Sequence, residues 1–176
     1  IIILTIMTLC EAGDHLVVSS QLYGGTVNLF RLTLPKFGIK STFVKPRDTQ
    51  GFKDAIQKNT KGIFGELVGN PGNELMNMPE IAKIAHDAGI PLMVDSTYQT
   101  PYLCKPFEHG ADIVVHSLTK WMAGHGSSMA GILVEGGKFD WLQNDKFPSM
   151  TQPYEGYHGL SFAEEFGPTA FTMKAR

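Results

Sequence analysis

The strongest constraint on the fold is an alternation of short apolar runs with segments of helical periodicity. Six runs rich in branched apolar residues have the length of strands, and four segments between or before them repeat their apolar residues at helical spacing. This alternation is typical of βαβ units and predicts an α/β fold with a mostly parallel sheet. The expected strands are His15–Ser20, Ile39–Val44, Lys61–Glu66, Ile90–Asp95, Asp112–Ser117 and Met129–Glu135.

The expected helices differ in how clearly their ends are marked. The clearest is the last, where Asn77 stands at the cap position, Pro79 and Glu80 lie in the first turn, and Gly89 follows the final turn. Caps of this kind are typical of helix termini. The four expected helices are Ile1–Ala12, Gly25–Leu34, Gly51–Asn59 and Met78–Ala88.

Composition narrows the class of ligand. The 176 residues are 43% hydrophobic, and the net charge is −2 with basic residues scattered along the chain. We therefore expect one globular unit with no binding to nucleic acid or membrane, and a small-molecule ligand instead. Cys10 and Cys104 lack CxxC spacing, which favours a reducing compartment, the cytoplasm by default. The apolar start, Ile1–Leu9, is shorter than the ~20 residues of a membrane span and reads as a buried helix.

Polar residues follow two neighbouring strands of the expected sheet. Asp95 ends one apolar run, and Lys120 follows the next in the turn Ser117-Leu118-Thr119-Lys120. Parallel strands could deliver this carboxylate and this amine to one sheet edge. Pyridoxal phosphate requires such a pair, a lysine that binds it covalently and an acid for its ring nitrogen. A solvated lysine and a turn aspartate are the structural alternatives.

Other functional classes lack their motifs. Gly124-His125-Gly126 has no third glycine of a dinucleotide fingerprint, and no G-x-S-x-G sequence is present. The six histidines are dispersed and not paired at zinc-ligand spacing, so no metal site is expected.

Three segments resemble the Cys/Met-metabolism family of pyridoxal-phosphate enzymes, and three further segments resemble its O-acetylhomoserine sulfhydrylases. The resemblance implies the large domain of a fold-type I PLP-dependent transferase, with a twisted, mostly parallel sheet and helices on both faces. The family segments are Gln21–Thr26, Val94–Leu103 and Ser117–Lys120, and the sulfhydrylase segments are Gly136–Trp141, Tyr157–Leu160 and Ala170–Arg176.

The resemblance also implies roles for residues around the cofactor. Lys120 would bind the cofactor and later move protons, Asp95 would face the pyridine nitrogen, and Thr97 would support that ring edge. Ser117 and Thr119 resemble phosphate contacts. The match is imperfect at two neighbouring positions, where this chain has Ser96 and Tyr98 and many relatives have Asn and Phe.

Two further residues are assigned in the same way. Tyr23, before Gly24-Gly25, resembles the tyrosine that stacks on the cofactor ring and takes part in proton transfer. Asn70, before Pro71, resembles the asparagine that hydrogen-bonds the phenolic oxygen of the cofactor. An ordinary strand-to-helix turn and a plain Asn-Pro turn are the alternatives for these positions.

The activity implied by the resemblance is γ-replacement on O-acetylhomoserine with sulfide or a thiol, giving homocysteine or methionine. A cystathionine γ-synthase, a γ-lyase of the same family and a non-catalytic α/β fragment are the alternatives. We expect residues 1–145 to be part of the PLP-binding large domain and residues 146–176 a loop leading into a further domain. On this interpretation the chain is a fragment of a cytoplasmic enzyme that forms a homotetramer.

Overall fold

The computed structural model describes all 176 residues and contains one six-stranded sheet. The strand order is β2-β1-β3-β4-β5-β6. Strands β1 to β5 pair in parallel, and only β6 runs antiparallel to β5, so the predicted mostly parallel sheet is confirmed. The strands are β1 (His15–Ser19), β2 (Lys40–Val44), β3 (Thr60–Glu66), β4 (Leu92–Asp95), β5 (Ile113–Ser117) and β6 (Gly131–Glu135).

All six expected strands are present, with ends that differ by one or two residues. The central strands are buried because helices and loops cover both faces of a parallel sheet, which explains their nearly continuous apolar sequences. Every residue of β1 is buried. The strand expected from Ile90 begins at Leu92, directly after Pro91, which has no N–H for the sheet ladder.

The chain forms eight α-helices, several of them a single turn long. The helix at residues 78–87 ends as predicted, with Gly89 at a φ of +65°. Its start needs a correction, because the Asn77 side chain makes no capping hydrogen bond and instead donates to Glu80 Oε2 over 2.7 Å. The helices are α1 (Ile2–Leu9), α2 (Gly24–Asn28), α3 (Thr49–Asp54), α4 (Met78–Asp87), α5 (Thr100–Leu103), α6 (Pro148–Thr151), α7 (Phe162–Phe166) and α8 (Ala170–Ala175).

The second expected helix, Gly25–Leu34, lies where it was predicted, but only its first part is α-helical. Regular α-helix ends at Asn28 and continues as a π turn over Leu29–Thr33 and a 3₁₀ turn over Leu34–Phe37. Pro35 has no N–H to continue the α-helical ladder, so the chain tightens there. It then ends at Gly38, whose φ is +79°.

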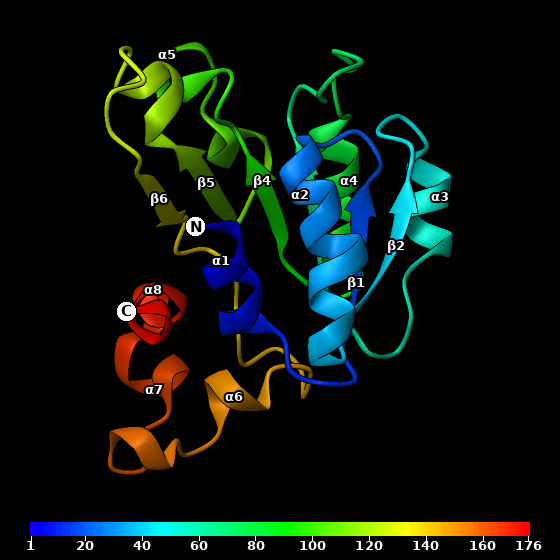
Figure 1. The fold of residues 1–176 in the computed structure, drawn as a ribbon. Coiled ribbons are helices and arrows are strands. Elements are labelled where there is room, and N and C mark those ends of the chain that lie inside the picture. Colours follow the sequence, from blue (N-terminus) through cyan, green and yellow to red (C-terminus); the bar gives the residue numbers. More distant parts are fainter.

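Residues 146–176, expected as a loop, form the short helices α6, α7 and α8. In Figure 1 these helices gather at one end of the molecule, where α8 packs against α1. Their apolar side chains join the same hydrophobic core as the sheet. The aromatic residues involved are Phe147, Phe162 and Phe171, which lie close to Trp141 in the same core. The division at residue 145 and a further domain beyond it stay predictions.

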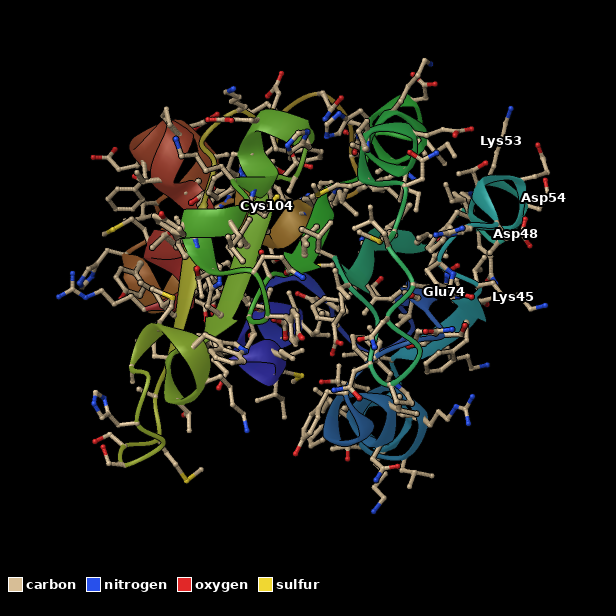
Figure 2. The ribbon with its side chains drawn as sticks, turned by 90° about the horizontal axis from the view of Figure 1, so that it is seen from above. Lys45, Asp48, Lys53, Asp54, Glu74 and Cys104 are labelled. Carbon is tan, nitrogen blue, oxygen red and sulfur yellow. The ribbon has the colours of Figure 1, made fainter.

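The edge of the sheet at β2, opposite the edge at β6, has charged residues around it. Figure 2 shows Lys45, Asp48, Lys53 and Asp54 grouped around α3 at one edge of the molecule. Charged side chains beside an edge strand such as β2 discourage pairing with another chain.

Both cysteines are free, as expected, with Cys10 buried. None of the helices combines the length and the apolar character needed to cross a membrane.

Candidate cofactor site

The candidate site is a cavity of about 970 Å³ at the carboxyl ends of the central strands. Ligand sites in open α/β sheets typically lie at this edge. Strands β3, β4 and β5 end there at Glu66, Asp95 and Ser117. The cavity brings together all seven residues predicted from the sequence, which are Tyr23, Asn70, Asp95, Thr97, Ser117, Thr119 and Lys120.

Asp95 occupies the carboxyl end of β4. Its Oδ1 accepts hydrogen bonds from the Thr97 hydroxyl at 2.5 Å and from the Thr97 backbone N–H at 2.9 Å. Burial raises the pKa of Asp95, while both bonds from Thr97 and the nearby His116 lower it. No lysine, arginine or histidine of the chain forms an ion pair with this carboxylate. A half-buried carboxylate without a cation is suited to a positively charged ligand group.

Thr97 connects the ends of two strands. Besides its bonds to Asp95, its hydroxyl accepts the Ser117 backbone N–H over 2.8 Å. The single residue thus fixes the distance between the carboxylate of β4 and the turn that follows β5. This turn contains the predicted lysine.

Lys120 lies in an irregular turn, Leu118–Met122, directly after β5. Its backbone is non-helical, with φ −89° and ψ −125°. The side chain is exposed, and its ammonium group makes no hydrogen bond or ion pair within the chain. The turn is held by Thr119, whose hydroxyl accepts the Ala130 N–H over 3.0 Å. A free amine is therefore presented to the cavity from an anchored turn.

Tyr23 enters the cavity from the connection between β1 and α2. It is the residue before the first turn of α2, and its side chain is 58% exposed. The ring passes close to Gly25, where a Cβ atom would lie 2.7 Å from Tyr23 Cε1. This close approach explains the glycine at position 25, because a side chain there would displace the ring.

Asn70 follows β3 in a turn closed by the hydrogen bond from Asn73 N to the Gly69 carbonyl, 2.7 Å long. Its side chain lines the cavity and has no hydrogen-bond partner within the chain. Gly69 and Gly72 of this turn lie against Gln21, and a Cβ atom at Gly69 would lie 2.6 Å from the Cβ of Gln21. The turn is thus packed closely against the segment that leads to Tyr23.

Two titratable residues were missed from the sequence, Glu66 in the cavity and His116 beside Asp95. Glu66 lines the cavity, is 8% exposed and lies opposite Asp95 in the register of β3 and β4. Burial and the Asp95 charge raise its pKa to about 7. The buried His116 holds the Ser96 carbonyl over 3.0 Å, and burial lowers its pKa. Glu66 could have been found by the strand-end argument used for Asp95.

Comparisons with known proteins point to one family. A family model described as Cys/Met metabolism PLP-dependent enzyme matches residues 2–168. The homocysteine synthase of Schizosaccharomyces pombe is 47% identical over 98% of this chain. The O-acetyl-L-homoserine sulfhydrylase of Leptospira meyeri is 45% identical, also over 98% of the chain. The chain spans only 41% of each of these two relatives.

Solved structures of two similar proteins have the same fold as this chain. The crystal structure of a putative O-acetylhomoserine (thiol)-lyase from Campylobacter jejuni, with N'-pyridoxyl-lysine-5'-monophosphate, has a TM-score of 0.91 and 32% identity. It covers 97% of this chain, which covers 42% of that one. The O-acetylhomoserine sulfhydrylase of Wolinella succinogenes has a TM-score of 0.84 and 37% identity, with coverages of 99% and 47%. The expected fold-type I PLP-enzyme fold is thereby confirmed.

Proposed function

The chain belongs to the Cys/Met-metabolism family of PLP-dependent enzymes, and on that premise we propose that the protein containing it replaces the γ-substituent of an activated homoserine. The proposed substrate is O-acetylhomoserine, the sulfur donor is sulfide or a thiol, and the products are homocysteine or methionine and acetate. The names and the identities of the relatives support this choice. The observation that carries the proposal is the meeting of a free amine, Lys120, and a half-buried carboxylate, Asp95, in one cavity.

The residues of the cavity fit pyridoxal phosphate. Lys120 would hold the cofactor covalently, and its amine has no competing partner in the chain. Asp95 would face the ring nitrogen, and it is a half-buried carboxylate that lacks a cation. Ser117 and Thr119 would contact the phosphate from the turn after β5, and Asn70 the phenolic oxygen.

When bound, pyridoxal phosphate accepts the electron pair released as the Cα–H bond of the substrate breaks. The Nζ of Lys120 would remove the Cα proton and then move protons at Cβ. Asp95 would face the ring nitrogen, and the hydrogen bonds from Thr97 lower its pKa against the effect of burial. Tyr23 holds its ring over the cavity and assists proton transfer. Acetate leaves from Cγ, and the sulfur donor forms its bond to the same carbon.

The proposal extends to assembly and location. We expect a homotetramer in the cytoplasm, as the family resemblance implies. Trp121 and Met129 line the cavity with exposures of 66% and 94%, and large apolar side chains exposed in this way favour a subunit contact. Light scattering of the purified protein measures the mass of the assembly, and a monomeric mass would contradict this part of the proposal.

The test of cofactor binding is chemical. The natural protein containing this chain should be yellow after purification, and borohydride reduction followed by peptide mass mapping should place the adduct on Lys120. Lys120→Ala should abolish the adduct, whereas Lys138→Ala, which removes an exposed lysine further along the chain, should retain it. An adduct on another lysine, or no adduct in a yellow protein, contradicts the assignment.

The test of substrate choice compares sulfur donors. With O-acetylhomoserine, kcat/KM should be higher for sulfide than for cysteine, because a zwitterionic donor needs partners for its buried charges. Little 2-oxobutanoate should form when sulfide is present. Equal rates with cysteine would indicate a cystathionine γ-synthase, and dominant oxoacid formation a γ-lyase.

A further inference from the structure

We propose that Glu66 is a positioning residue of the cofactor site, because its buried carboxylate ties the backbone of Tyr23 to the end of β3 and so holds the Tyr23 ring over the cavity. This inference rests on the proposed function, in which the Tyr23 ring contacts the cofactor. It adds a role for a residue that neither the motifs nor the family resemblance pointed to.

The first step is the geometry of the bond. Glu66 Oε1 accepts the Tyr23 backbone N–H over 2.6 Å, across 43 residues of sequence. This distance is short for an N–H donor. The Tyr23 carbonyl accepts from Val27 within α2, so it does not link the residue to the sheet. The Glu66 bond is the one hydrogen bond that joins Tyr23 to a strand.

The second step is what the bond restrains. The Tyr23 side chain is 58% exposed, and its hydroxyl has no hydrogen-bond partner within the chain. Packing therefore contributes little to the ring position, apart from the close approach to Gly25. The backbone position of Tyr23 decides where the ring lies, and Glu66 restrains this backbone.

The third step is the position of Glu66 between two connections that line the cavity. Glu66 is the last residue of β3, shortly before the turn that contains Asn70, and its carboxylate bonds the β1–α2 connection, which contains Tyr23. The bond therefore ties the Tyr23 connection to the end of the strand that leads into the Asn70 turn.

The fourth step is the energetic cost of this arrangement. Glu66 is buried and lies opposite Asp95 in the sheet register, so two carboxylates share one desolvated strand end. Burying a carboxylate beside another destabilises a fold. A residue with a purely structural task at this position could be apolar or an amide. The cost is consistent with a task at the site, since costly buried charges concentrate at functional sites.

The chain offers a matched control at the other end of the sheet. Asp112 is also a buried carboxylate that accepts a strand backbone N–H, from Leu92 over 2.8 Å, and it also binds His86. It does not line the cavity. Replacing Glu66 or Asp112 removes a buried acceptor of the same kind, but only the Glu66 change should alter the cofactor.

The experiment measures three variants of the holoprotein, Glu66→Ala, Glu66→Gln and Asp112→Ala. Glu66→Ala should reduce the circular dichroism of the bound cofactor and lower kcat about tenfold or more, since small misplacements of contacting groups are costly. Glu66→Gln retains a neutral acceptor and should restore part of both signals. Asp112→Ala should lower the melting temperature and leave the cofactor dichroism unchanged. If an alanine variant does not fold, Glu66→Gln and Asp112→Asn decide by the same comparison.

A double-mutant cycle tests the route through Tyr23. In a Tyr23→Ala background, Glu66→Ala should have little further effect on kcat or cofactor dichroism, because the ring that it positions is gone. Unchanged dichroism in Glu66→Ala, or effects that multiply with those of Tyr23→Ala, would overturn the inference. Failure of the proposed function is a separate outcome, in which the wild-type protein forms no cofactor adduct on Lys120. Even then, faster hydrogen exchange of the Tyr23 amide in Glu66→Ala supports the anchoring, and unchanged exchange refutes it.

Discussion

The hydroxyl of Thr97 donates a hydrogen bond to Oδ1 of Asp95 over 2.5 Å. Burial raises the pKa of this carboxylate, and the bonds from Thr97 oppose that rise. A protonated Asp95 could not hold a protonated ring nitrogen, so the charge of Asp95 depends in part on its neighbour two residues away. Thr97 therefore has an electrostatic task as well as the structural one of joining β4 to β5.

We predict that Thr97→Val weakens cofactor binding. Valine keeps the shape of the side chain but removes the donor to Asp95 and the acceptor for the Ser117 N–H. Hydrogen bonds to charged groups contribute about 1.5–3 kcal/mol, so the Kd of pyridoxal phosphate should rise about tenfold or more, measured by fluorescence titration of the apoprotein. Thr97→Ser should restore most of the affinity. An unchanged Kd in Thr97→Val would mean that the backbone N–H of Thr97 suffices.

A second prediction concerns Asp95 itself. Asp95→Asn keeps the side-chain volume and removes the charge that keeps the ring nitrogen protonated, so turnover should fall by orders of magnitude while some cofactor remains bound. The fold should tolerate the change, because burying an amide costs less than burying a carboxylate. Steady-state kinetics and the absorbance of bound cofactor give the two quantities. Near-normal turnover would assign Asp95 a structural role only.

The parallel sheet and the positions of Asp95 and Ser117 at its edge could be predicted from local sequence. Their strands are continuous apolar runs, and the carboxyl ends of parallel strands lie at the same edge of the sheet whatever conformation the loops adopt. The convergence of Tyr23 and Asn70 on the same cavity was available only through the family resemblance. Nothing in a Tyr-Gly-Gly or an Asn-Pro sequence specifies where the turn lies relative to a distant strand.

Other parts could not be predicted because they depend on contacts between distant residues. Glu66 ended a predicted strand, but its importance arises from the register that sets it opposite Asp95 and from its bond to Tyr23. The short helices after residue 146 lack any period in the sequence. Their aromatic side chains are ordered by one another, as in the stacked rings of Trp141 and Phe171, 5.6 Å apart.

The third prediction tests whether these last helices stabilise the sheet. Phe171 is fully buried, and its backbone N–H donates to Glu135 of β6 over 3.2 Å. Phe171→Ala should lower the free energy of unfolding by about 3–5 kcal/mol, measured by urea titration, and should speed hydrogen exchange in β6. Leu142→Ala, at a side chain that is 54% exposed, is the control. A loss confined to the last helices, with β6 unchanged, would indicate a separately folding segment.

The last prediction concerns the pH dependence of stability in the cofactor-free protein. The pKa of Glu66 is raised from 4.5 to about 7, first by burial and then by the charge of Asp95. The unfolded chain therefore ionises before the folded one does. The stability contributed by protonated Glu66 is fully present below pH 4.5, decreases as the pH rises, and is lost above about pH 7.

Glu66→Gln isolates this contribution, because glutamine does not titrate and the titrations of other groups cancel to first order when the two proteins are compared. The wild type minus Glu66→Gln difference in the free energy of unfolding should fall by about 3 kcal/mol between pH 4.5 and 8, at ~1.4 kcal/mol per pKa unit. Urea titrations at several pH values measure it. In an Asp95→Asn background the fall should be smaller, since one cause of the raised pKa is removed. A difference that does not change with pH would show that the pKa of Glu66 in the folded apoprotein is not raised, because the hydrogen bond from the Tyr23 amide offsets both burial and the Asp95 charge.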